Sequence, residues 1–318
     1  MKLYQRDEIA AAVGIDEEAL RQVEAGFAAL GRGEAVQPPI LSMSMEEFNS
    51  EVDVKTAHLK GWERFAIKVS TGSFDNPKRG LPSLSGLMML FSAETGRVEA
   101  VLFDDGYLTM VRTAVAGAIA AKHLSRRTSR RVAVIGAGEQ AHRQVEALRL
   151  VRDIDILDVW TRRRESAEAY ADDMRRQGLE VHLHDSVRAA CEQADIIVTA
   201  TPSREPLLQA RDLPEGVHVT AMGSDSPDKR ELDESVLTRA DAFVCDTRAQ
   251  SEHNGELKVF AGQDREPPFK VHELGRVIER GETLRVSDAA ITVCDLTGTG
   301  VQDTAIASFA LSRLAQGG

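Results

Sequence analysis

Cysteine, positive charge and long apolar runs are all scarce in this sequence. Only three cysteines occur among 318 residues, at positions 191, 245 and 294, and none has C-x-x-C spacing. Neither a disulfide framework nor a structural zinc site is therefore expected. The 39 Lys and Arg residues face 50 Asp and Glu residues, which gives a net charge of −11. This charge argues against nucleic acid and anionic membranes as partners.

The sequence also has no feature of a membrane or exported protein. No stretch approaches the roughly 18 consecutive apolar residues of a membrane-spanning helix. The first residues, MKLYQRDE, are charged where a signal peptide would be apolar, so we expect a soluble cytoplasmic protein. Among the eight histidines only His182 and His184 lie close together, and no third ligand is near them, so no metal site is predicted.

The length and a hydrophobic content of 42% predict two domains with full cores, and residues 1–124 have the pattern of an α+β domain. A helix is predicted over 16–30, with apolar residues at helical spacing behind an acidic first turn. Short apolar runs separated by turn residues follow between positions 36 and 101 and favour strands. The alanine-rich segment TMVRTAVAGAIAAKHL predicts a buried helix with Arg112 near its start.

Strands and helices alternate from residue 130 onward, which predicts a parallel sheet with right-handed crossovers. The expected strands are RVAVIG, DILDVW, VHLH, ADIIVTAT, HVTAMG and AFVCD. The basic segment 122–131 marks the boundary, and the helical segment DTAIASFALSRLA is expected to pack back on the first domain. We therefore expect one domain made of 1–124 and 300–318, and a second made of 125–299.

A glycine-rich turn predicts a dinucleotide site. The strand VAVI ends in G-x-G-x-x-A, and a helix follows at once. Gly136 permits the tight turn, Gly138 lets the backbone approach a pyrophosphate, and Ala141 keeps the helix close to the strand. The helix N-terminus, at Glu139 and Gln140, would face the phosphates. The neighbouring strands and helix supply the context that a glycine motif alone lacks.

The choice between NAD and NADP depends on the end of the second strand. The acidic residue that would bind the ribose 2′-hydroxyl is missing, and Trp160, Thr161 and Arg162 stand there instead. An arginine at this corner can hold a 2′-phosphate, stack on adenine or face solvent. The position of Arg162 after the second strand, taken alone, favours NADP only slightly.

Six short motifs follow one another along the chain: FAIKVS around Lys68, DDG through Arg112 and Thr113, GAGEQA, TATPS, MGSDSPDKRELD and GTGVQD. Together they resemble the ornithine cyclodeaminase/μ-crystallin family over essentially the whole chain. VDVKTAHLKGWERFAIKVS and VCDLTGTGVQDTAIA are most similar to its ectoine-utilization (EutC) and iminosuccinate reductase branch. The resemblance implies an α/β protein with a Rossmann NAD(P)-binding domain plus an α+β substrate and dimerisation domain. It also implies a homodimer with an active site between the domains.

The resemblance further implies roles for individual residues. Lys68 and Arg112 would bind the carboxylate of an α-imino acid, and Asp225 would contact the reacting nitrogen. If burial lowers the pKa of Lys68, a fraction of its side chains is neutral, and Lys68 could then share the proton transfer with Asp225. The implied cofactor-binding residues are Arg112, Thr113, Gly136, Gly138, Glu139, Gln140, Trp160, Thr161, Arg162, Thr201, Met222, Gly223, Ser224 and Gly300.

The residues alone leave plainer interpretations open. Lys68 could be a strand lysine that reaches solvent, and Arg112 an exposed helical arginine. Asp225 could be a turn or helix-cap residue, and Asp228 and Glu231 fit helix caps better than catalysis. The cysteines lie in apolar segments and are expected in the core.

One departure from the family pattern bears on the substrate. Many members have an arginine after the proline pair at 38–39, and Ile40 stands there in this chain. Lys55, in VDVKTAHLKG, adds a cation where other branches carry a non-basic residue. A second cation favours a second carboxylate and would repel the distal ammonium of ornithine. Ser85 and His58 are further candidates for the distal carboxylate, and Lys55 as an ordinary edge-strand lysine stays open.

These expectations lead to an oxidoreductase that acts on CH–NH2 or C=N groups. The leading hypothesis is an imine reductase that reduces iminosuccinate to L-aspartate with NAD(H), and NADP(H) stays open. One alternative is an NAD-dependent cyclodeaminase for ornithine or diaminobutyrate in ectoine degradation. Another is a non-catalytic protein that binds NADPH and a small ligand, like μ-crystallin; the presence of Lys68, Arg112 and Asp225 argues against it.

Overall fold

The computed structural model describes residues 1–316, without the side chain of Pro77, and divides into two compact units. Unit 1 comprises Met1–Arg112 and the C-terminal segment from Thr299, and unit 2 comprises Thr113–Gly298. The helix α3 (Tyr107–Leu124) contributes residues to both units. The division therefore falls between Arg112 and Thr113, inside this helix, and not in the basic segment 122–131, which begins in its last turn.

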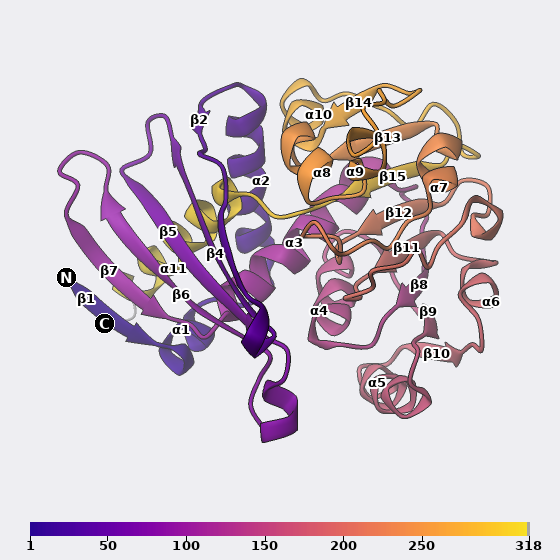
Figure 1. The fold of residues 1–318 in the computed structure, drawn as a ribbon, viewed down its shortest axis with the longest axis horizontal. Coiled ribbons are helices and arrows are strands. Elements are labelled where there is room, and N and C mark those ends of the chain that lie inside the picture. Colours follow the sequence, from indigo (N-terminus) through magenta and orange to yellow (C-terminus); the bar gives the residue numbers. More distant parts are fainter. Residues whose placement is uncertain (317–318) are drawn as a thin grey trace. The chain divides into compact units, whose positions relative to one another are not determined.

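Unit 1 is built on a largely antiparallel sheet (Figure 1). Its order is β1-β7-β6-β5-β4-β2, with β3 also paired to β4; β1 and β7 are parallel and the other pairs are antiparallel. The strands are β1 (Lys2–Gln5), β2 (Ala35–Val36), β3 (Leu41–Met45), β4 (Ser50–Leu59), β5 (Arg64–Ser73), β6 (Leu84–Ser92) and β7 (Val98–Phe103). The helical elements are α1 (Arg6–Ala12), α2 (Glu17–Gly31), η1 (Glu46–Phe48), η2 (Asn76–Arg79) and α11 (Gly300–Gln316).

The C-terminal helix α11 packs against α2, β4 and β5 and fills the core of unit 1. Its residues 300–307 are all buried. Gly300 lies so close to β4 that a Cβ there would come within 2.3 Å of the Thr56 carbonyl oxygen. The helix α2, Glu17–Gly31, lies where a helix over 16–30 was predicted. Asp16 caps its N-terminus by accepting from the amides of Glu18 and Ala19.

Unit 2 is a doubly wound sheet of eight parallel strands, in the order β10-β9-β8-β11-β12-β15-β13-β14 (Figure 1). The strands are β8 (Arg131–Ile135), β9 (Ile156–Trp160), β10 (Glu180–Leu183), β11 (Ile196–Thr199), β12 (His218–Ala221), β13 (Ala242–Cys245), β14 (Val271–Glu273) and β15 (Thr292–Asp295). The helical elements are α4 (Glu139–Leu148), α5 (Arg164–Arg176), α6 (Val187–Cys191), η3 (Ala210–Asp212), α7 (Glu234–Arg239), α8 (Arg248–His253), α9 (Lys258–Ala261) and α10 (Leu274–Arg280).

The strands of unit 2 are buried on both faces, as their continuous apolar sequences predict. In β8, for example, Val132 and Val134 belong to one apolar cluster, and Ala133 and Ile135 belong to another. The three cysteines are buried among such side chains, and burial raises the pKa of each thiol. Among residues 1–316, no helix is both long and apolar enough to cross a bilayer.

The strand order reverses at β8, since β9 and β10 lie on one side of it and β11 and β12 on the other. In doubly wound sheets, ligands bind beyond the carboxyl ends of the strands at this point. The mixed α/β fold with a Rossmann-like parallel sheet is therefore as the sequence predicted.

Candidate functional site

Two lysines face each other on the buried side of the unit 1 sheet. Lys55 on β4 is directly opposite Lys68 on β5 in the antiparallel register, so their side chains lie on the same face. Lys55 is 6% exposed and Lys68 is 2% exposed. Both lysines are buried, so Lys55 is not the solvent-facing edge-strand lysine that the sequence left open. The strand β4 pairs with β5 on one side, and on the other side with β3 before Lys55 and with β2 after it.

Arg112 is a third buried cation, and its charge acts on Lys68. It lies on α3, is 6% exposed, and donates from Nη1 to Oε1 of Gln302 at 2.8 Å. The charge of Arg112 acts directly on Lys68 and lowers its pKa. We call Lys55, Lys68 and Arg112 the cation cluster.

A buried aspartate of α11 lies between two members of the cation cluster. Oδ2 of Asp303 is 3.2 Å from Nζ of Lys68, and Oδ1 is 3.1 Å from Nε of Arg112. Asp303 is fully buried, and within the described residues its oxygens have these ion pairs but no partner with full hydrogen-bond geometry. Asp303 was not among the predicted site residues, although a lone acidic residue in the apolar segment GVQDTAIASFAL is a signal that could have indicated it.

The environment of Lys68 changes its titration. Burial, with the positive charges of Arg112 and Lys55, lowers the pKa of Lys68 to about 7, although the carboxylate of Asp303 opposes the shift. Asp104, which accepts from the amide of Leu108 at the start of α3, also interacts with Lys68. Burial raises the pKa of Asp104 to about 6. Lys68 can therefore exchange a proton near neutral pH, and a bound anion would favour its charged form.

The glycine turn after β8 has the geometry that a dinucleotide site needs. Gly136 has φ of +124°, and a Cβ there would lie 2.6 Å from the carbonyl oxygen of Ala200. Its amide donates to the carbonyl of Trp160 at the end of β9. Gly138 precedes α4 and provides no side-chain cap, and a Cβ at Gly138 would meet nothing within 4 Å. The turn thus leaves an open approach to the N-terminus of α4, which starts with Glu139 and Gln140.

The predicted ribose corner lies at the end of β9. Trp160 and Thr161 are half-buried there, and Arg162 is exposed in the turn before α5. An exposed arginine at this place is compatible with each of the three roles that the sequence left open.

A buried glutamate connects the loops that follow β11 and β12. Glu231 accepts from the Thr201 amide and hydroxyl, both at 2.7 Å, and from the Gly223 amide at 2.8 Å. It also accepts from the Thr199 hydroxyl at 2.6 Å. Glu231 is fully buried and α7 is capped by Asp233, so the prediction of a helix cap at Glu231 is wrong. Its sequence context gave no sign of this role.

Asp225 follows the Met222-Gly223-Ser224 segment beyond β12, and Met222 is buried. The Asp225 side chain is half-exposed, and its Oδ1 is 2.8 Å from Nζ of Lys229. Ser224 accepts from Nζ of Lys258 at 3.1 Å and donates to the carbonyl of Lys229 at 2.8 Å. These contacts fix the backbone that carries Asp225.

Four predicted residues are placed as follows. Ser85 and His58 occupy strand positions whose alternation points them away from the face of Lys68, and Ser85 is exposed and donates to Asp105. The structure therefore does not bring Ser85 to the cation cluster. In unit 2, the Thr113 carbonyl accepts from Gln144. In unit 1, Gly300 serves close packing against β4.

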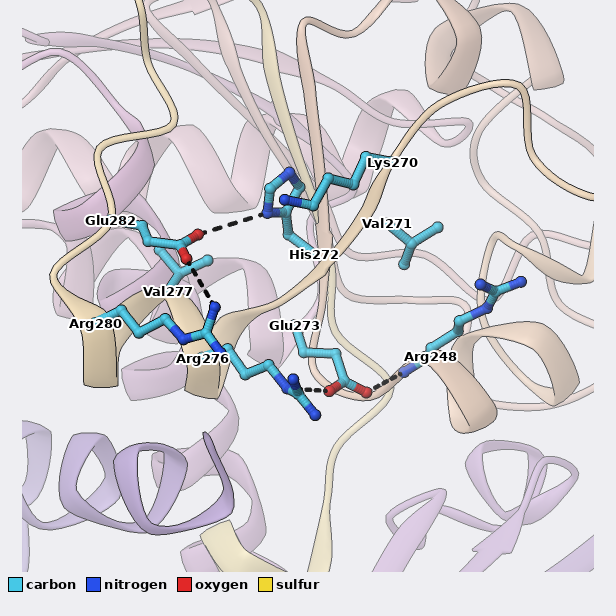
Figure 2. Close-up of a pocket in the computed structure, with 9 residues that line it drawn as sticks. All are labelled: Arg248, Lys270, Val271, His272, Glu273, Arg276, Val277, Arg280 and Glu282. Atoms are coloured by element: carbon cyan, nitrogen blue, oxygen red, sulfur yellow. Dashed lines mark hydrogen bonds and ion pairs between the residues drawn. The ribbon is translucent and has the colours of Figure 1, made fainter. Parts of the chain in front are cut away.

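A cavity of about 290 Å³ lies beside β14 and α10 (Figure 2). Its charged side chains pair with one another, for example Arg276 with Glu273 at 3.4 Å and Arg280 with Glu282 at 3.4 Å. No predicted site residue lines it, so it is separate from the candidate site.

The chain is similar to characterised and uncharacterised proteins over nearly its whole length. A putative dehydrogenase of Rhizobium meliloti (strain 1021) is 47% identical over 315 residues, 98% of this chain and 95% of the relative. An uncharacterized cyclodeaminase of Sinorhizobium fredii is 46% identical over 318 residues, 98% of this chain and 96% of the relative. Iminosuccinate reductase of Paracoccus denitrificans (strain Pd 1222) is 33% identical over 297 residues, 92% and 90% of the two chains.

Solved structures agree with this similarity. An archaeal alanine dehydrogenase dimer with bound NAD superposes with a TM-score of 0.92 at 32% identity and covers 100% of this chain and 97% of that one. The Paracoccus denitrificans iminosuccinate reductase in complex with NAD+ superposes with a TM-score of 0.90 at 29% identity, with the same coverage. The family model described as "Ornithine cyclodeaminase/mu-crystallin family" matches residues 2–318. The chain belongs to the ornithine cyclodeaminase/mu-crystallin family.

Proposed function

We propose that this protein is an NAD(H)-dependent imine reductase that reduces iminosuccinate to L-aspartate. The observation that carries the proposal is the buried pair of Lys55 and Lys68, opposite each other on one sheet face, with the charge of Arg112 acting on Lys68. The general reaction class, NAD-dependent redox chemistry on an imine or an amino acid, is supported by the relatives named above. The choice of a dicarboxylic substrate rests on the cation cluster.

Buried cations are costly unless an anion compensates them, and the lowered pKa of Lys68 reflects that cost. A substrate with two carboxylates brings two negative charges to this surface. Arg112 and Lys68 would bind the carboxylate beside the imine carbon, and Lys55 would bind the distal one. The ammonium of ornithine would meet Lys55 instead, so the same cluster disfavours a diamino acid.

The cofactor supplies hydride to the imine carbon when it is bound. The turn at Gly136 and Gly138 fits such a group, because a side chain is sterically excluded at Gly136 and the space beside Gly138 is open. Those glycines and the first turn of α4 would hold the pyrophosphate, Trp160, Thr161 and Arg162 would contact the adenosine end, and Thr201 with the 222–224 segment would border the nicotinamide. Thr113 and Gly300 stay in the proposed cofactor set. NAD(H) is proposed over NADP(H) because relatives have been solved with NAD or NADH bound.

Asp225 would hydrogen-bond the substrate nitrogen and stabilise its protonated iminium, which is the form that accepts hydride most readily. Its ion pair with Lys229, at 2.8 Å, would hold the carboxylate in place. Lys68, with a pKa of about 7, would supply or receive the proton that balances the reaction.

Unit 1 would bind substrate and form a homodimer, and unit 2 would bind the dinucleotide. The sheet face opposite Lys68 carries half-buried apolar residues, including Ile67, Val69 and Met89, which support a second copy as its partner. The archaeal relative is a dimer in its solved structure. Light scattering of the purified protein tests this assembly.

The test of the reaction is oxidation of NADH by the purified protein with iminosuccinate, formed from oxaloacetate and ammonia. The proposal predicts loss of reduced cofactor with equimolar L-aspartate as product. Proline formation from ornithine with no net change in NADH, and no reduction of iminosuccinate, would instead identify a cyclodeaminase. Binding of NADPH without turnover of either substrate would favour a non-catalytic ligand-binding protein.

A further inference from the structure

One carboxylate in unit 1 has no role in the proposed reaction, yet it lies inside the cation cluster. Asp303 is fully buried and contacts both Lys68 and Arg112 at ion-pair distance. Gln302, the preceding residue of α11, accepts from Arg112. Two successive residues of one helix therefore contact the guanidinium, Gln302 at Nη1 and Asp303 at Nε.

We propose that Asp303 is a positioning residue that orients Lys68 and Arg112 for a substrate carboxylate and offsets part of their positive charge. The inference deepens the proposed function and rests on Lys68 and Arg112 binding a carboxylate. Asp303 itself would not touch the substrate, because both of its oxygens already face the two cations.

The charges around Lys68 explain why an aspartate is needed. Arg112 from α3 and Lys55 from β4 are positive, whereas Asp303 from α11 and Asp104 before α3 are acidic. Burial and the two cations already lower the pKa of Lys68 to about 7 in the presence of Asp303. Without the charge of Asp303, Lys68 would be neutral at physiological pH and would bind a carboxylate poorly.

The structure separates this electrostatic role from the packing of the helix. Thr304, the next residue of α11, accepts from the Ala66 amide at 3.1 Å and donates to the Ala57 carbonyl at 2.7 Å. Those bonds fasten α11 to both β4 and β5. Thr304→Val removes them at nearly constant volume and is therefore a matched control for a purely structural effect.

The experiment compares Asp303→Asn with Thr304→Val in two measurements. The first is an NMR titration of Lys68 in protein made with isotope-labelled lysine, with the signal assigned by its absence from Lys68→Arg. The inference predicts that Asp303→Asn lowers the pKa of Lys68 by about 1 to 3 units, the usual effect of a nearby opposite charge. Thr304→Val should lower the melting temperature and leave this titration unchanged.

The second measurement is the pH profile of KM for iminosuccinate. Above neutral pH, Asp303→Asn should raise KM about tenfold for each unit by which the pKa of Lys68 falls. At lower pH Lys68 regains its proton, so KM should return part of the way to the value of the original protein. Asp303→Ser takes the place of Asp303→Asn if the asparagine variant does not fold. An unshifted Lys68 titration in a folded neutral variant overturns the inference. A shifted titration in protein that does not reduce iminosuccinate supports the role of Asp303 and overturns the proposed substrate.

Discussion

Lys55 and Lys68 are direct cross-strand partners on the buried face of the unit 1 sheet. Like charges in this position repel and destabilise a sheet. A bound anionic ligand would reduce this repulsion. We therefore expect unit 1 to be less stable without such a ligand than with it.

The pH dependence of ligand binding follows from the titration of Lys68. Its lowered pKa of about 7 means that the ammonium form, which binds carboxylates, is lost as pH rises through neutrality. Succinate is a convenient probe because it has two carboxylates and cannot react. We expect its dissociation constant, measured by calorimetry, to rise about tenfold per pH unit above pH 7. In Lys68→Met, binding should be weak at every pH and this dependence should disappear; a retained inflection would assign it to another group.

Two glycines of the dinucleotide turn are expected to behave differently on substitution by alanine. Gly136→Ala places a Cβ against the Ala200 carbonyl at positive φ, so it should cost about 1–3 kcal/mol of folding stability and also weaken NADH binding. Gly138→Ala meets open space in the protein, so the melting temperature should stay unchanged. NADH affinity should nevertheless fall about tenfold, or about 1.4 kcal/mol, because the new methyl group would lie where the pyrophosphate is proposed to bind. Fluorescence titration with NADH measures the effect, and full affinity in Gly138→Ala would contradict this placement.

Glu231→Gln is expected to weaken the loops beyond β11 and β12. An amide has one oxygen acceptor, so the donors from Thr201 and Gly223 cannot all keep a partner. We expect a loss of about 3 kcal/mol in the free energy of unfolding, measured by urea denaturation. Asp228→Asn changes an exposed carboxylate in the same segment and should stay within about 0.5 kcal/mol of the original protein. Equal stabilities of the two variants would show that Glu231 does not anchor these loops.

The sequence predicts the family from short motifs. It predicts the fold class and most elements because the apolar strands, the helical spacing over 16–30 and the G-x-G-x-x-A turn are local signals. The burial of Lys55 and Lys68 could not be predicted in the same way. Strand alternation gives two faces but does not say which one α11 covers, so both orientations of Lys68 were open. The β4–β5 register decides that the two lysines are partners.

The residues that the sequence missed act through long-range contacts. Asp303 is 235 positions from Lys68 in the chain, and Glu231 binds Thr201 in the loop after β11 as well as Gly223 in its own loop after β12. Glu231 lies between short polar segments typical of a helix start, which is why a cap was predicted. Its function depends on the order of the strands, because that order brings the ends of β11 and β12 together.

The most direct test of the account is the selectivity of the protein before and after Lys55→Met. The measured quantity is the ratio of kcat/KM for iminosuccinate to kcat/KM for 2-iminopropionate, which lacks the distal carboxylate, with NADH as reductant. The account predicts a strong preference for iminosuccinate in the original protein and a loss of this preference of about tenfold or more in Lys55→Met, since a hydrogen bond to a charged group contributes about 1.5–3 kcal/mol. Lys60→Met changes an exposed lysine nearby and should keep the ratio. A preference for 2-iminopropionate in the original protein, or a ratio that Lys55→Met leaves unchanged, would contradict recognition of a dicarboxylate by the cation cluster.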